Sequence, residues 1–145
     1  MNLGSMTTNS SLVGPVLAMV FLTCIVWLIM YFRRVRAMKS QGIDPNKLHS
    51  PAEQAKLAGP ANWPAENYNH LFEMPVLFYV VCLLFIATGK GDAETVQLAW
   101  GFVATRVIHS AIQISYNKIT HRFSVFLVSS IVMFLLLYKA WALLM

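Results

Sequence analysis

Three ionisable side chains, Glu73, Arg106 and His109, stand within long apolar stretches of this sequence. A charged group in hydrocarbon costs several kcal/mol, so such groups are usually paired with one another or functional. The two stretches meet at a turn near residues 90 and 91, about 17 residues after Glu73 and about 15 to 18 residues before Arg106 and His109. Since a helix rises about 1.5 Å per residue, the three groups are predicted to lie at one depth.

Polar side chains repeat along the stretch after this turn, at spacings of three and four residues: Arg106, His109, Gln113 and Tyr116. This spacing places them on one side of a helix. His70 and Glu73 are three residues apart and share one side of the preceding helix. Pro75 lacks an N–H and is predicted to bend that helix, which frees a backbone acceptor beside the cluster. We therefore expect a polar cluster that faces the interior of a helical bundle.

Other interpretations of this cluster stay open. A glutamate–arginine pair could serve only to fix the register of two helices, although such a pair needs no additional His, Gln and Tyr. His70, His109 and Glu73 could ligate a metal ion, but their spacing matches no recognised motif and an adjacent arginine opposes a cation, so no metal is expected. Cys24 and Cys82 lie in apolar stretches, where a thiol is inert, so a protein thiol nucleophile is not expected.

The elements that must position the cluster are predicted to be membrane helices. The chain has 145 residues, of which 57% are hydrophobic and only 12% are charged. This composition excludes both an ordinary soluble domain and a disordered chain. We predict an all-α integral membrane four-helix bundle, formed by a single domain over residues 1–145, with spans at residues 12–32, 68–88, 93–116 and 122–144. The cytoplasmic loop at 33–67 is predicted to hold a short helix at 51–58, because Ser50-Pro51-Ala52-Glu53 has the form of a capping box.

The basic residues predict how these spans are oriented. Eight of them lie on the side of the long loop: Arg33, Arg34, Arg36, Lys39, Lys47, Lys56, Lys118 and Arg122. The opposite side carries Lys90 and Lys139. Because positive charge marks the cytoplasmic face, both termini are expected on the non-cytoplasmic side, of the inner membrane if the protein is bacterial. The net charge of +5 then indicates contact with the lipid bilayer, and no nucleic-acid partner is expected.

Two motifs give the sequence a specific resemblance. The stretch over residues 66–79, Glu-Asn-Tyr-Asn-His-Leu-Phe-Glu-Met-Pro-Val-Leu-Phe-Tyr, resembles the start of the second helix in the MAPEG family. These membrane-associated proteins in eicosanoid and glutathione metabolism are small four-helix proteins that include microsomal glutathione transferases and leukotriene synthases. Glu73 and Pro75 fit the family pattern. The segment Arg106-Val107-Ile108-His109, with Tyr116-Asn117 and Arg122 after it, resembles the family's Arg-x-x-His stretch and later arginine. The resemblance covers essentially the whole chain and is to a bacterial-type member.

The resemblance implies a homotrimer with a glutathione site between subunits, near the cytosolic membrane face. Glutathione would be the co-substrate, and a lipophilic electrophile or lipid hydroperoxide would be the second substrate. Carried over to this chain, Glu73 would hold the glutathione amine, and Arg106 would pair with Glu73 or a ligand carboxylate. Arg122 and Tyr116 would be catalytic, as stabilisers of the thiolate. The resemblance also implies further binding residues: His70, Asn69, Gln113 and His109.

One departure from the family pattern keeps alternatives open. His70 stands where catalytic members usually have asparagine, three residues before Glu73. An imidazole can accept or donate a hydrogen bond as an amide does, though not both at the same positions. Besides a glutathione-dependent transferase or peroxidase, the sequence therefore permits a non-catalytic membrane scaffold with this fold. A small proton-coupled multidrug transporter that uses Glu73 is a further alternative.

Overall fold

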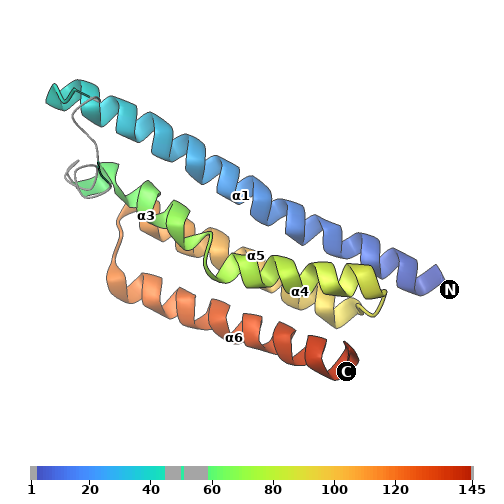
Figure 1. Ribbon diagram of the computed structural model, residues 1–145. Helices are drawn as coiled ribbons and strands as arrows, with labels where there is room; N and C mark the ends of the chain where they lie inside the picture. Colours follow the sequence, from blue (N-terminus) through green and yellow to red (C-terminus); the bar gives the residue numbers. More distant parts are fainter. Residues whose placement is uncertain (1–2, 45–49, 51–58, 145) are drawn as a thin grey trace.

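The computed structural model describes the backbone of residues 3–44, 50 and 59–144. This part of the chain is helical and contains no strand, which confirms the predicted all-α class. The elements run in the order α1 (Leu3–Gln41), η2 (Gly59–Ala61), α3 (Trp63–His70), α4 (Met74–Thr88), α5 (Ala93–Ser115) and α6 (Ile119–Leu144) (Figure 1). The helix predicted at 51–58 lies outside the described residues.

The first helix is much longer than the span predicted from its apolar run. It has 39 residues and continues to Gln41, beyond the predicted end at residue 32. Its basic last turn suits the partial negative charge at a helix C-terminus, and Gly42 follows with a φ of 62°. Leu12, Met19 and Val26, seven residues apart, are buried, and this repeat gives α1 a single face toward the bundle.

The structure divides the predicted span 68–88 into two helices. α3 ends at His70 and α4 begins at Met74, with Leu71 to Glu73 forming a turn between them. Pro75 stands in the first turn of α4, where its missing N–H leaves no helical hydrogen bond unmade. The bend predicted at Pro75 is thus a complete interruption of the helix, and Glu73 is placed in a turn and not on a helix face.

The next two helices begin close to their predicted positions. Asp92 caps α5: its Oδ1 accepts from the Thr95 backbone N–H at 2.8 Å, and its own N–H donates to Thr95 Oγ1 at 3.4 Å. This reciprocal pair satisfies two backbone donors at the helix start. α6 begins at Ile119, three residues before the predicted 122.

The four long helices form one bundle (Figure 1). α1 and α6 each pack against both α4 and α5. Between α4 and α5 the rings of Phe78 and Phe102 stack with their centroids 4.7 Å apart, and both side chains are fully buried. Both ends of the chain lie at the same end of the bundle (Figure 1).

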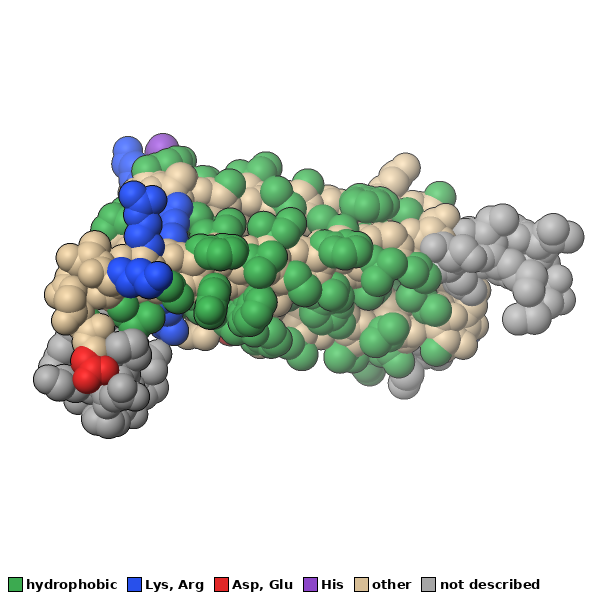
Figure 2. Space-filling model, turned by 90° about the horizontal axis from the view of Figure 1, so that it is seen from above, with side chains coloured by type: hydrophobic (Ala, Val, Ile, Leu, Met, Phe, Trp, Pro, Cys, Tyr) green, Lys and Arg blue, Asp and Glu red, His purple; other side chains and the backbone are tan. Residues whose placement is uncertain are grey.

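The outer surface of the bundle is apolar along its length. Figure 2 shows hydrophobic side chains over its flank and Lys and Arg side chains gathered at one end. Within the described residues, three stretches are long and apolar enough to cross a membrane: α1, the stretch Gly59–Thr88 that contains η2, α3 and α4, and α6. α5 falls outside this set because its buried face carries charged and polar residues. Its 23 residues are nevertheless enough for the roughly 20 residues that a span requires.

Candidate functional site

The predicted polar stripe lies on the buried face of α5. Arg106 is 1% exposed, His109 is 3% exposed and Gln113 is fully buried. They continue a stripe whose earlier members are apolar or small, among them Ala99 and Phe102. The fourth predicted member differs. Because α5 ends at Ser115, Tyr116 caps the helix and is exposed.

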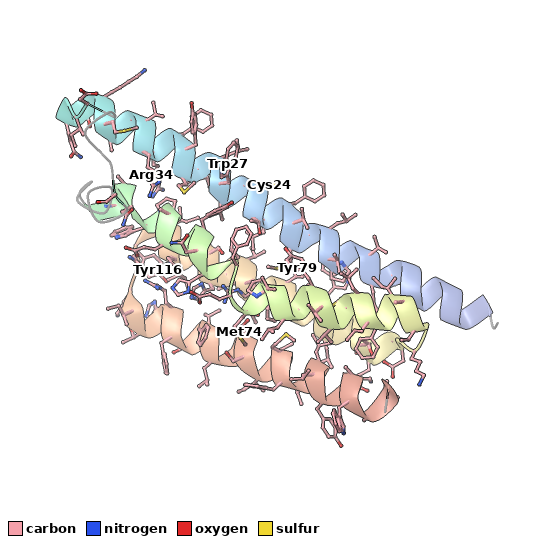
Figure 3. The ribbon with its side chains drawn as sticks, in the orientation of Figure 1. Cys24, Trp27, Arg34, Met74, Tyr79 and Tyr116 are labelled. Atoms are coloured by element: carbon pink, nitrogen blue, oxygen red, sulfur yellow. The ribbon has the colours of Figure 1, made fainter. Side chains whose placement is uncertain are left out.

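Two contacts of His70 show that the end of α3 and the middle of α5 lie at the same depth in the bundle. Its backbone carbonyl accepts a hydrogen bond from Arg106 Nη2 at 3.4 Å. Its ring centroid lies 6.2 Å from that of His109, with the two planes nearly perpendicular. The nitrogen atoms of this region form a row between the start of α4, where Met74 is labelled, and the end of α5, where Tyr116 is labelled (Figure 3).

Glu73 and Arg106 were expected to pair directly, but each of them instead contacts His70: Glu73 its imidazole and Arg106 its backbone carbonyl. Glu73 Oε2 lies 2.8 Å from His70 Nδ1, and no ion pair within the described residues joins Glu73 to Arg106. The reason is the interrupted helix: in the turn before Pro75 the Glu73 side chain points outward and is 58% exposed.

Several polar atoms in this interior have no hydrogen-bond partner within the described part of the chain. They include Nε and Nη1 of Arg106, Nδ1 of His109 and both amide atoms of Gln113. Asn67 is fully buried on α3 and accepts a hydrogen bond from Ser110 on α5 at 3.2 Å, while its Nδ2 is unpartnered. Buried polar atoms in proteins almost always have partners, so this interior is suited to hold water or polar ligand atoms.

An open groove of about 420 Å³ runs beside this interior. Its polar side is formed by residues of the α3–α4 junction, α5 and α6, and its other side is apolar; the lining residues are His70, Glu73, His109, Ile119, Arg122, Phe123 and Phe126. Arg122 is held in place because its Nη1 donates to Asn117 Oδ1 at 2.6 Å. A groove with a few convergent charged groups and an apolar wall is typical of a site for a partly polar small molecule.

The groove brings together only part of the predicted residue set. Glu73, His70, His109 and Arg122 line it. Arg106 and Gln113 lie buried on the same face of α5 as His109 but are not among the lining residues. Asn69 is exposed and lies outside the groove lining.

Tyr116 also lies outside the groove lining. Its hydroxyl is 3.0 Å from His121 Nδ1, and the two rings meet edge to face. Tyr116 therefore belongs to the connection between α5 and α6, where Asn117 adopts a positive φ of 52°.

The apolar wall of the groove could not be predicted from the sequence. Phe123 and Phe126 belong to an apolar run in which every residue could equally face lipid, and Ile119 lies in the polar break before it. Asn67 was also missed as the buried partner of α5. Its spacing of three residues before His70, itself three before Glu73, would have placed it on the same helix face as His70.

Comparison with known protein families matches residues 12–142 to one described as the MAPEG family. The match covers nearly the whole chain, including every element of the groove. No curated protein matches the chain. No solved structure matches it either.

Proposed function

The chain belongs to the MAPEG family, and we propose that it is a membrane-embedded glutathione-dependent enzyme. In this proposal it transfers glutathione to lipophilic electrophiles or uses it to reduce lipid hydroperoxides. Family membership supports a role in glutathione or eicosanoid metabolism in general. The groove between α3, α5 and α6 supports the narrower proposal.

The single observation that carries the proposal is the placement of both charge signs in one groove on an apolar bundle. Glutathione has two carboxylates, one ammonium and one thiol. Arg122 supplies a cation and Glu73 an anion on the same groove, so ligand groups of both signs find a partner. The buried Arg106 lies one hydrogen bond behind His70 and adds positive charge where partial desolvation strengthens its effect.

The roles follow from where the side chains lie. We assign the glutathione ammonium to Glu73, whose Oε1 can accept a hydrogen bond while Oε2 contacts His70. We assign the thiolate to Arg122, since a nearby cation raises the thiolate population at neutral pH. Tyr116, outside the groove lining, is not assigned to the sulfur. The wall of Ile119, Phe123 and Phe126 would contact the lipophilic substrate.

The surface charges support the predicted orientation. Lys and Arg side chains gather at one end of the bundle (Figure 2), and positive charge favours the cytoplasmic side. We place the groove's polar side toward the cytosol, where glutathione is supplied, and both termini on the other side. The second substrate would then enter from the bilayer. The family relationship supports a homotrimer, in which a neighbouring subunit would cover part of the apolar flank.

Binding and thiolate formation test this function on the purified protein in lipid nanodiscs. We expect glutathione to bind and to give the ultraviolet absorbance of a thiolate at neutral pH. Arg122→Leu should remove the thiolate signal, and Glu73→Gln should weaken binding. Arg36→Leu is the matched control, because Arg36 is an exposed arginine that does not line this groove. Absence of binding by the unchanged protein at millimolar glutathione would refute the proposal.

The His70–Glu73 contact favours one second candidate, a non-catalytic scaffold. The carboxylate assigned to the ammonium is partly engaged by an imidazole at 2.8 Å. If His70 blocks the ligand, His70→Asn should create glutathione binding that the unchanged protein lacks. Equal binding by both proteins would exclude the scaffold.

A further inference from the structure

The contact between His70 and Glu73 has the form of a carboxylate–imidazole dyad. His70 Nδ1 lies 2.8 Å from Glu73 Oε2, and both residues line the groove. With the carboxylate ionised, the nitrogen beside it must carry the hydrogen, since a carboxylate only accepts hydrogen bonds. In a neutral imidazole this leaves Nε2 with a free lone pair.

We propose that this dyad is a general base that removes the thiol proton of the substrate bound in the groove. The inference rests on the proposed function and adds to it the group that receives the proton. An imidazole oriented by a carboxylate is an effective proton acceptor, because the carboxylate fixes the tautomer and stabilises the imidazolium that forms. Arg122 is a cation that can stabilise the thiolate but cannot take its proton, since a guanidinium has no acceptor.

The local backbone explains why these two residues can act together. His70 is the last residue of α3 and Glu73 precedes α4, so neither side chain is held against a continuous helix. The His70 carbonyl accepts from the Glu73 N–H and from Arg106 Nη2, both at 3.4 Å. These bonds anchor the backbone on both sides of the imidazole. The His70 side chain is 37% exposed, so substrate can reach it.

The charged and titratable groups around His70 come from three elements. Glu73 stands on its own turn, His109 and Arg106 on α5, and Arg122 across the groove on α6. Glu73 is the carboxylate of this group, and it stabilises the imidazolium that forms when the thiol proton arrives.

The proposed step conserves atoms and electrons. The thiol proton passes from sulfur to His70 Nε2, and the S–H electron pair stays on sulfur as a thiolate beside Arg122. For an activated alkene, the sulfur then bonds to one alkene carbon and the π pair moves to the neighbouring carbon. That carbon takes the proton back from His70, which restores the neutral dyad.

Stopped-flow measurement of thiolate formation tests the base directly. At saturating glutathione we expect His70→Gln to slow thiolate formation about 100-fold at pH 7, a typical contribution of a general base. In the variant the rate should rise in proportion to hydroxide, whereas in the unchanged protein it should level off. His121→Gln is the control, since His121 lies outside the groove lining. If His70→Gln binds glutathione and forms the thiolate as fast as the unchanged protein, the dyad is not the base. That result would leave the proposed function intact.

A second measurement decides the dyad without glutathione. Nitrogen NMR of labelled imidazole should show His70 with its proton on Nδ1, and Glu73→Leu, which has no acceptor, should remove this preference. A proton on Nε2 in the unchanged protein overturns the dyad. Failure of the unchanged protein to bind glutathione would overturn the proposed function and, with it, the thiol step.

Discussion

Replacing Arg106 with methionine separates a ligand-binding arginine from one that only fixes the register of two helices. Arg106 is 1% exposed and makes one hydrogen bond, at 3.4 Å, while two of its nitrogens are unpartnered within the described residues. Its burial is therefore poorly compensated when no ligand is present. Exchange of a whole buried ion pair for apolar groups of similar volume is often neutral or stabilising by about 1–4 kcal/mol, and Arg106, which has no ion-pair partner within the described residues, should follow the same trend. We expect Arg106→Met to unfold no more easily than the unchanged protein when glutathione is absent.

The same substitution should remove the stabilisation that glutathione provides. A ligand at 100 times its dissociation constant stabilises the folded state by about 2.7 kcal/mol. We expect this gain in the unchanged protein and its loss in Arg106→Met. Thermal unfolding in nanodiscs, with and without glutathione, measures both quantities. Val107→Met, on an exposed neighbouring position, controls for the added methionine.

The opposite result would show that the reasoning is wrong. Removal of one partner from a well-formed buried ion pair costs about 3–5 kcal/mol, because a charge is left uncompensated. If Arg106→Met loses that much stability without ligand, the Glu73–Arg106 interaction is structural. The register interpretation of the sequence would then replace a role for Arg106 in glutathione binding.

Three further predictions concern the core and the end of the bundle opposite the basic residues. Phe102→Ala should lower the free energy of unfolding by about 3–5 kcal/mol, because the ring stacks on Phe78. Denaturant unfolding measures this loss, and a loss of only about 0.5 kcal/mol, as for an exposed residue, would contradict the packing. Lys139→Met should cost less than about 1 kcal/mol in the same assay, since its carboxylate partners are half-exposed or more; a larger loss would show a buried pair. Burial raises the pKa of Asp92, but hydrogen bonds from Thr95 and Lys139 outweigh it and lower that pKa to about 2. A carboxyl with a depressed pKa stabilises the folded state at pH values above its unfolded-state pKa of about 3.9. The unfolding temperature should therefore fall as the pH is lowered from 4 to 2, and it should fall less in Asp92→Asn.

The helical class and the α5 stripe could be predicted because both depend on local spacing. Apolar runs of sufficient length predict membrane helices, and spacings of three and four place Arg106, His109 and Gln113 on one face. Tyr116 follows the same spacing, but α5 ends at Ser115, so its side chain leaves the stripe. Where a helix ends depends on the turn that follows, and periodicity alone does not report it.

The position of Glu73 could be predicted in depth but not in direction. Counting residues from the turn placed it level with Arg106, and the His70 carbonyl that accepts from Arg106 lies at that level. Direction depends on whether the helix continues through Pro75, and here it does not. The burial of the asparagines on α3 depends on the same turn-by-turn geometry. Asn67 is buried and Asn69 is exposed.

The interruption before Pro75 explains why the candidate site lies at this point of the bundle. Non-helical backbone is tolerated at membrane depth only where protein or a water-filled cavity surrounds it. Here the turn from Leu71 to Glu73 has Arg106 donating to the His70 carbonyl on one side and the groove on the other. His70 ends α3 and Glu73 is the last residue of this turn, and both residues line the groove. In a continuous helix the His70 carbonyl would accept a backbone hydrogen bond, and Arg106 would lack this acceptor. The interruption of the helix therefore makes a polar site possible at this point of the span.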